Sequence, residues 1–258
     1  MTDNMHISAC CKNYIEYRKT ILAPAKEDLF NILHSKNLKL HQAVSFNFLI
    51  AHAIDYIKAI RESLDISESR IDFVRSFDKI FGIDGQRISN RKFELIDAIN
   101  NAFKHITLDH KRYSDLRDKY GEISFRSLKE SDGRILCILD NYRFDYARVI
   151  LRPTYDAILI NALENEEDVI EYARGEHDCH FWSSDDEIMS SDDPCLAIDQ
   201  MIIACNSPCT DCGELENDCY CAEFIYDGED GYFESRFSAE FDFDTVMSRI
   251  SGAYSPNK

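Results

Sequence analysis

The sequence lacks any apolar run that approaches the roughly 20 residues a membrane-spanning helix requires. Residues 1–19 also lack the apolar segment and the small-residue cleavage site of a secretory signal peptide. Phosphate-binding loops, dinucleotide glycine patterns, H-E-x-x-H and G-x-S-x-G motifs are likewise absent from the chain. We therefore expect a cytoplasmic protein without membrane contact, outside the common nucleotide-binding, zinc-protease and serine-hydrolase classes.

Positive charge is scarce in the C-terminal part of the chain. Residues 153–258 contain 4 Lys and Arg against 26 Asp and Glu, a net of −22, whereas residues 1–152 contain 25 against 21. A surface this acidic repels phosphates, so RNA would be contacted only through the N-terminal part. The charge predicts a basic protein partner for the acidic part, while plain solubility and mimicry of a nucleic acid are alternative explanations.

Enough apolar material is present for a packed core, with 45% hydrophobic and 12% aromatic residues over 258 positions. Between residues 40 and 64 the apolar positions advance by three or four, over a length too great for a strand. The same spacing predicts further helices over residues 22–35, 71–81, 96–116 and 154–173. The chain is therefore mainly helical, and the last of these helices is expected to end at Gly175.

The period of the apolar residues changes to two beyond Gly121. Ile123 and Phe125 precede the turn sequence ESDGR, and an apolar run over 135–139 follows it. This pattern predicts an antiparallel hairpin whose loop is longer than the tightest kind, and residues 143–152 can extend the sheet.

Together these patterns predict an α+β protein, mainly α, in two parts. Residues 1–152 would form a helical domain with a terminal β-hairpin. Residues 153–258 would form an acidic, cysteine-rich α+β module, in which the alternation of aromatic and acidic residues over 224–243 indicates strands.

The predicted helix over 96–116 carries a polar stripe beside its apolar face. Asn101, His105 and Asp109 are spaced by four residues, so successive side chains share nearly the same azimuth. Lys104 lies between the stripe and the apolar face. Such a stripe is either a solvated or partner-binding surface, or a set of catalytic groups.

The segment DAINNAFKH (97–105) carries a resemblance to known proteins. A long helix containing AHAIDYIKAI, a second helix, and a helix that ends in NAFKH before a short β segment resemble a group of uncharacterised bacterial helical proteins. Those proteins share an Asn-Ala-Phe/Tyr-Lys-His signature and are similar to the HEPN superfamily of helical bundles. The resemblance covers about residues 40–150 and implies a helical bundle that forms a homodimer.

HEPN ribonucleases combine a His with an Arg that precedes it with four to six residues in between, and the pair acts on the scissile phosphate across a dimer. The Arg stabilises phosphoryl charge and the His transfers protons. None of residues 98–100, where that Arg would stand, is basic in this chain. The resemblance therefore implies a degenerate, metal-independent endoribonuclease in which His105 is the acid and base, and Lys104, Asn101 or a remote basic residue holds the phosphate.

Seven of the ten cysteines lie beyond residue 152. In a reducing compartment, closely spaced cysteines are typical of metal ligands or free thiols rather than of disulfides. The segment CNSPCTDCGELENDCYC (205–221) contains a C-x2-C pair and a C-x-C pair, which can surround one tetrahedral zinc ion. The predicted ligands are Cys209, Cys212, Cys219 and Cys221, with Cys205, His177, Cys179 and His180 as alternates.

A structural zinc ion would fasten a region that has little apolar material of its own, because its binding energy becomes folding energy. Free buried thiols without metal are one alternative, and a catalytic zinc ion is another.

The sequence thus supports three functions. The first is a cytoplasmic bacterial interaction or regulatory protein whose acidic, zinc-stabilised C-terminal part binds a basic partner. The second is a degenerate HEPN-like ribonuclease of a toxin or phage-defence system that uses the NAFKH helix. The third, a nucleic-acid mimic, rests on charge alone.

Overall fold

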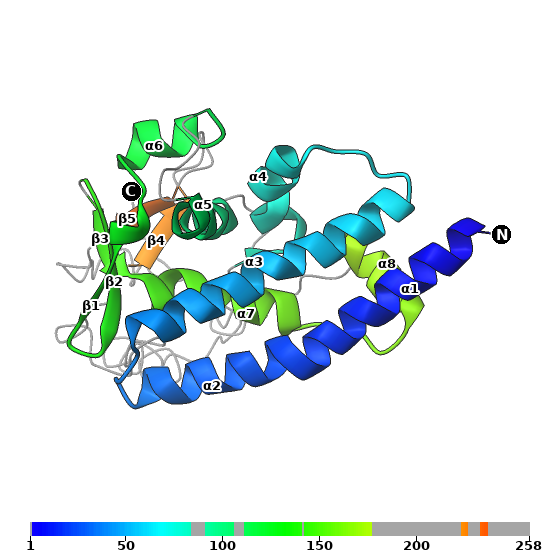
Figure 1. Cartoon of the computed structure of the whole chain (residues 1–258), viewed down its shortest axis with the longest axis horizontal. Coiled ribbons are helices and arrows are strands. Elements are labelled where there is room, and N and C mark those ends of the chain that lie inside the picture. Colours follow the sequence, from blue (N-terminus) through cyan, green and yellow to red (C-terminus); the bar gives the residue numbers. More distant parts are fainter. Residues whose placement is uncertain are drawn as a thin grey trace, which may run out of the picture.

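The computed structural model describes residues 2–83, 91–105, 111–140 and 142–176, together with two strands at 223–226 and 233–236. The described chain is mainly helical and carries a small antiparallel sheet after the N-terminal helices, as predicted (Figure 1). The other residues, among them most of the predicted C-terminal module, lie outside this description.

Two long helical segments form the base of the molecule. Helix α1 (Thr2–Tyr17), the π-helical turn η1 (Arg18–Leu22) and α2 (Ala23–His34) follow one another as a nearly continuous rod, and α3 (Leu40–Ser63) lies along it (Figure 1). The predictions of α2 and α3 are confirmed, and Pro24 does lie in the first turn of α2. Helix α1 was not predicted, because its apolar residues are few and Cys11 and Tyr14 supply its buried face.

Helix α5 (Lys92–His105) packs against α3, and α4 (Arg70–Ile80) packs against α5. Ser69 begins α4 by accepting a hydrogen bond from the amide of Asp72, at 3.1 Å. The prediction of one helix over 96–116 is wrong, because residues 111–113 form a turn and a separate helix, α6, covers Ser114–Tyr120. The reason is a tertiary contact: Arg112 and Tyr113 reach back to a buried carboxylate on α5.

The sheet follows α6 and the 3-10 turn η3 (Phe125–Ser127). Strands β1 (Leu128–Ser131), β2 (Arg134–Leu139) and β3 (Tyr142–Asp145) pair in sequential antiparallel order. The first strand starts later than predicted, and the loop is the tightest kind rather than a longer one. Asp132 and Gly133 alone connect β1 to β2, with φ values of 51° and 72°, as a primed two-residue turn requires.

The chain then returns to helices. The π-helical turn η4 (Ala147–Leu151) leads into α7 (Arg152–Leu159), and α8 (Glu166–Arg174) follows after a short irregular segment. The single helix predicted over 154–173 is therefore divided in two, since Asn165 leaves the helical conformation and accepts hydrogen bonds from the first amides of α8. Gly175 ends α8 with a φ of 75°, as predicted.

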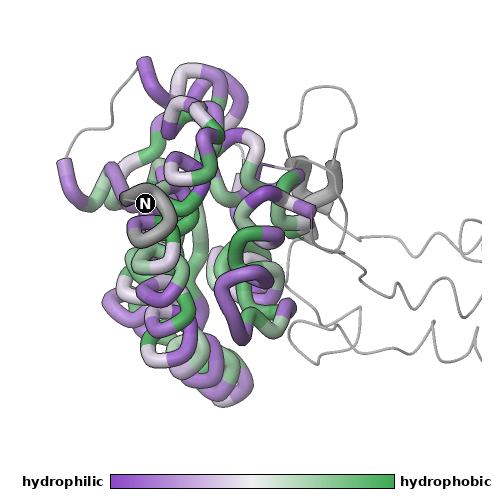
Figure 2. The backbone as a smooth tube through the Cα atoms, turned by 90° about the vertical axis from the view of Figure 1, so that its right-hand side faces the viewer, coloured by the Kyte–Doolittle hydropathy of each residue, from purple (hydrophilic) through white to green (hydrophobic). Residues whose placement is uncertain are grey.

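One hydrophobic core joins these elements. It extends from Cys11 on α1 to Ala173 on α8, and each helix contributes one apolar face, visible in Figure 2 as green alternating with purple. Residues 153–176 therefore share the core of the helical body, on the far side of the charge boundary at residue 152. The acidic, cysteine-rich module predicted over 153–258 stays a prediction, since most of it lies outside the described residues.

Strands β4 (Glu223–Tyr226) and β5 (Phe233–Arg236) form an antiparallel pair within the acidic part. Both lie in or next to the range 224–243, where alternation predicted strands.

Candidate functional site on helix α5

Helix α5 carries the NAFKH sequence, and three contacts fix its position. The buried carboxylate of Asp78 on α4 accepts hydrogen bonds from the amides of Lys92 and Phe93, at 2.6 and 2.9 Å, and so caps the helix N-terminus. The ring of Phe93 stacks on Phe77, with centroids 3.9 Å apart. Asn47 on α3 donates to the carbonyl of Ile96 at 3.2 Å. The polar residues on α5 are therefore presented from a rigid support.

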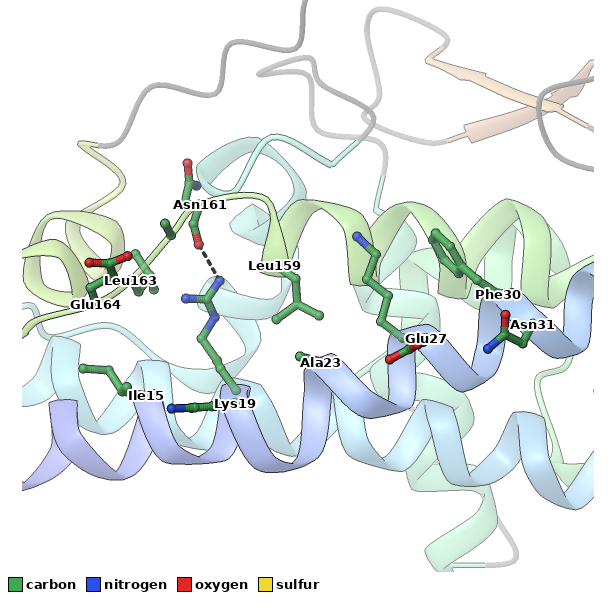
Figure 3. Close-up of a pocket in the computed structure, with 13 residues that line it drawn as sticks. Ile15, Lys19, Ala23, Glu27, Phe30, Asn31, Leu159, Asn161, Leu163 and Glu164 are labelled. Atoms are coloured by element: carbon green, nitrogen blue, oxygen red, sulfur yellow. Dashed lines mark hydrogen bonds between the residues drawn. The ribbon is translucent and has the colours of Figure 1, made fainter.

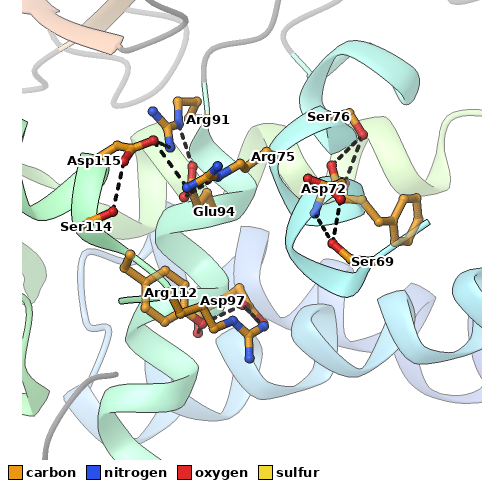
Figure 4. A network of polar contacts seen from close by, with 12 residues as sticks. Ser69, Asp72, Arg75, Ser76, Arg91, Glu94, Asp97, Arg112, Ser114 and Asp115 are labelled. Atoms are coloured by element: carbon orange, nitrogen blue, oxygen red, sulfur yellow. Dashed lines mark hydrogen bonds and ion pairs between the residues drawn. The ribbon is translucent and has the colours of Figure 1, made fainter. Parts of the chain in front are cut away.

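The centre of the site is Asp97, whose side chain is fully buried. Arg112 Nη2 lies 2.7 Å from Asp97 Oδ2 (Figure 4). The Tyr113 hydroxyl donates to the same oxygen at 2.6 Å, and Arg70 Nη2 lies 3.3 Å from Oδ1. Arg70 also pairs with Asp55 on α3, which lies 3.5 Å from His52 Nδ1. The Asp97 carboxylate thus connects α4, α5 and the turn before α6, and the Arg70–Asp55 pair extends this network to α3.

A second polar cluster lies at the N-terminal end of α5. Glu94 pairs with Arg91 at 2.5 Å and with Arg75 at 3.6 Å, and both arginines also approach Asp115 on α6, at 3.9 and 3.2 Å (Figure 4). The hydrogen bond from Ser114, followed by the two guanidinium groups, lowers the pKa of Asp115. This cluster fastens α6 to α4 and α5 on the same side of the bundle as Asp97.

The environment of Asp97 shifts the pKa of two neighbours. Burial, reinforced by the Asp97 carboxylate, raises the pKa of Tyr113, so its hydroxyl stays protonated as a donor. Burial lowers the pKa of Arg70, but the Asp97 and Asp55 carboxylates outweigh burial and raise the pKa overall. Both effects keep the network in the protonation state that its hydrogen bonds require.

The three residues predicted for catalysis occupy different environments. Asn101 is half-buried, and its amide nitrogen donates to the Asp97 carbonyl at 2.9 Å and to the Tyr113 hydroxyl at 2.5 Å. Lys104 and His105 are exposed in the last turn of α5, where positive charge suits the negative end of the helix dipole. Asn101 therefore belongs to the Asp97 network, and only Lys104 and His105 face solvent.

Two arginines near this face were not identified from the sequence. Arg70 and Arg112 belong to α4 and to the turn before α6, so no spacing along the chain relates them to Asn101 or His105. Both are bound to carboxylates, and the two positive charges meet two negative ones on Asp55 and Asp97. This arrangement can fasten helices, but a guanidinium already paired with carboxylates is a poor ligand for a phosphate.

Aromatic rings surround the exposed end of α5. Phe103 forms edge contacts with Phe48 on α3 and Phe125 on η3, with centroids 6.3 and 6.5 Å apart. Phe125 is 44% exposed, and the Arg126 guanidinium lies 5.4 Å from its ring centroid. A partly exposed ring with cations around it is a surface on which a nucleobase can stack.

The predicted zinc ligands Cys209, Cys212, Cys219 and Cys221, and the alternates Cys205, His177, Cys179 and His180, lie outside the described residues. Within the part of the chain that the structure describes, no group of three or more His, Cys, Asp or Glu side chains could hold a metal ion.

The described cysteines Cys10, Cys11 and Cys137 are free thiols. Burial raises the pKa of Cys11 to about 11 and also raises that of Cys137, so these thiols are structural rather than reactive.

Helix α3 is the one described helix whose length and composition would suit a membrane span, a feature that its sequence pattern did not predict. Half of its most apolar window is buried inside the protein, and its buried Asn47 and Arg61 form hydrogen bonds with other elements. These are properties of a core helix.

Comparisons with protein-family models, with curated proteins and with solved structures find no match to this chain.

Proposed function

We propose that the protein is a cytoplasmic bacterial interaction or regulatory protein whose acidic C-terminal part binds a basic partner. The observation that carries this proposal is the charge of residues 177–258, which contain 19 Asp and Glu against 3 Lys and Arg. So few cations cannot neutralise the carboxylates within the segment, and the uncompensated charge attracts a partner of opposite sign.

The helical body supports this proposal, because its lysines pair with acidic residues that lie between residues 153 and 176. Asp156 on α7 pairs with Lys26 on α2 at 2.6 Å. Glu166 on α8 pairs with Lys12 on α1 at 3.3 Å and accepts a hydrogen bond from Ser8 at 2.7 Å. Part of the acidity between residues 153 and 176 thus fastens helices together, and the larger excess belongs to residues 177–258.

In this proposal a structural zinc ion, held by Cys209, Cys212, Cys219 and Cys221, stabilises the acidic part. Thiolate ligands suit zinc, and four of them close the coordination shell. The ion would give a loop-rich acidic segment one defined shape for its partner.

The test neutralises five carboxylates of the acidic part in the full-length protein, by converting Asp to Asn and Glu to Gln at Asp185, Asp186, Glu187, Asp192 and Asp193. A matched variant makes the same change of net charge at five exposed carboxylates of the helical body that form none of the ion pairs described above: Glu16, Asp28, Asp118, Glu122 and Glu171. Partners are captured from bacterial cells with each tagged protein, and the affinity for the purified partner is then measured.

We expect the wild-type protein and the body variant to retain a basic partner, and the variant of the acidic part to bind it at least about tenfold more weakly. If both variants bound the partner equally weakly, the interaction would depend only on the net charge of the protein and not on the acidic part. Equal binding by all three proteins would place the interface elsewhere, and either result would contradict the proposal.

A second candidate is a degenerate HEPN-like ribonuclease, favoured by the surface at the end of α5. There Lys104 and His105 are exposed next to Phe103, and Phe125 and Arg126 belong to the neighbouring turn. Such a surface could stack a base and hold a phosphate of single-stranded RNA, with His105 as the acid and base in a homodimer.

His105→Ala tests the second candidate, with His34→Ala as a matched control because His34 is an exposed residue in the last turn of α2. The candidate requires RNA cleavage in the presence of a chelator that His105→Ala abolishes and His34→Ala retains. Cleavage that survives in both variants, or that is absent from the wild-type protein, would contradict it.

A further inference from the structure

A pocket of about 750 Å³ lies between the α1–η1–α2 rod and the segment that connects α7 to α8 (Figure 3). Its wall is partly apolar, with Ile15, Phe30, Leu159 and Leu163 among the lining residues. Its size is within the range of small-molecule sites, about 300–1,000 Å³. None of the described residues that line this pocket belongs to α5.

The functional group of the pocket is the guanidinium of Arg18, which is 7% exposed. Arg18 Nη2 donates to the carbonyls of Ile158 and Asn161, at 3.0 and 2.7 Å, where α7 ends and its carbonyls have no helical partner. Arg18 is also the first residue of the π-helical turn η1, a distortion that occurs frequently at functional sites.

Two donors in this pocket have no acceptor among the described residues. Arg18 Nε and Asn161 Nδ2 are both buried and make no hydrogen bond. Both residues line the pocket, and the carbonyl of Asn161 is the acceptor of the hydrogen bond drawn in Figure 3. Buried donors without acceptors cost free energy unless a ligand or water satisfies them.

Arg18 also differs from every other buried arginine that the structure describes. Arg61 pairs with Glu68 at 2.5 Å, Arg91 with Glu94 at 2.5 Å, and Arg148 with Asp145 at 3.2 Å. Among the described residues Arg18 has no carboxylate within ion-pair distance, and two carbonyls and two neighbouring tyrosine rings are its partners. A buried cation without a counter-ion is stabilised when an anion binds to it.

We propose that this pocket binds a small organic acid with one carboxylate. The carboxylate pairs with the Arg18 guanidinium and accepts a second hydrogen bond from the Asn161 amide, after a small rotation of the two side chains. The aliphatic or aromatic part of the acid packs against Ile15, Leu159 and Leu163.

The surrounding charges select a monoanion over a phosphate. Lys26 at the rim is already paired with Asp156 at 2.6 Å, so Arg18 is the buried cation that lacks a counter-ion. Of the other charged residues that line the pocket, Glu27 and Glu164 balance Lys19 and Lys26, so the lining has the single excess positive charge of Arg18, which one negative charge matches better than two. If inorganic phosphate bound, the apolar side chains of the pocket would stay exposed to water, whereas the carbon chain or ring of an organic acid would cover them.

The experiment is calorimetric titration of the full-length protein with hexanoate, benzoate, inorganic phosphate and 1-hexanol, the last having the same chain as hexanoate without the charge. Arg18→Met removes the cation. Ala23→Trp fills the pocket from an exposed position of its wall, and Lys12→Met removes a cation that does not line it. Ala23→Trp keeps the test decisive if Arg18→Met fails to fold.

We expect hexanoate or benzoate to bind with a dissociation constant below about 1 mM. Arg18→Met and Ala23→Trp should weaken binding at least about tenfold, and Lys12→Met should leave it unchanged. Equal binding of hexanol, preferential binding of phosphate, no binding of either acid, or unchanged affinity in the pocket variants would each overturn the proposal.

Discussion

The helical body and the acidic segment of this chain use charge in opposite ways. In the body, buried carboxylates such as Asp97, Glu94 and Asp145 each meet at least one arginine, and the pairs connect different helices or cap them. In residues 177–258 the carboxylates outnumber the cations by 19 to 3. We infer that paired charge fastens this fold, and we propose that the excess negative charge of residues 177–258 serves binding.

Arg18 repeats this contrast within the body itself. It is the described buried arginine that lacks a carboxylate, and it lies in the wall of a pocket. The same reasoning that assigns a structural role to the Asp97 network therefore assigns a binding role to Arg18.

Removal of metal should have the largest effect on the acidic part and little on the body. If zinc fastens that part, a chelator releases one ion per chain, and the lost binding energy is on the order of 10 kcal/mol. Elemental analysis of chelator-washed protein, with proteolysis as the readout of folding, measures this. Cys209→Ser should abolish zinc binding, whereas Cys10→Ser on α1 should not. Protein without metal, and with all its thiols outside the core titratable, would contradict the zinc site.

Asp97→Ala should produce the largest loss of stability within the body. The substitution leaves Arg70, Arg112 and Tyr113 without their shared acceptor, and breaking a buried pair of this kind costs about 3–5 kcal/mol. Urea unfolding measures the change. Asp118→Ala, at an exposed position on α6, should change stability by no more than about 0.5 kcal/mol. Equal stability of the two variants would show that the network does not fasten the helices.

Arg18→Met should destabilise the body less than Asp97→Ala. Two carbonyls lose a donor, which costs about 1–3 kcal/mol, but a buried charge that has no counter-ion is also removed. Urea unfolding of Arg18→Met measures the change in unfolding free energy. Arg143→Met, on the exposed face of β3, is the control. A loss as large as that of Asp97→Ala would mean that Arg18 is a structural residue.

The smallest expected effect concerns pH. The hydrogen bonds from Ser8 and Lys12 lower the pKa of Glu166 in the folded state. Its contribution is therefore complete above the ordinary glutamate pKa of about 4.3 and is lost as the pH falls through the lowered value. Urea unfolding between about pH 2 and pH 7 should show a slightly flatter acid limb for Glu166→Gln than for Glu167→Gln. Identical profiles would argue against the link between α1 and α8.

The sequence predicted those helices and turns whose conformation is determined by residues within the same segment. Helix α3 is apolar along one face for its full length, and Gly175 ends α8 locally, so both were found. The break between α5 and α6 was not predicted, because the apolar spacing continues through it and the cause is a contact with Asp97.

The candidate sites show the same limit. The NAFKH sequence marked Lys104 and His105, which are both exposed, whereas Asn101 of the predicted polar stripe is half-buried. The arginines that flank Asp97, and the pocket around Arg18, are assembled from elements far apart in the chain. Arg18 and Asn161 are separated by more than a hundred residues, so no motif could have joined them.

Amide hydrogen exchange of the full-length protein, with and without its purified basic partner, tests the central proposal most directly. Our account expects slower exchange on binding within residues 177–258, and no change at the C-terminal end of α5 or at residues 125–126. Protection confined to the end of α5 and to residues 125–126, with none in the acidic part, would contradict it.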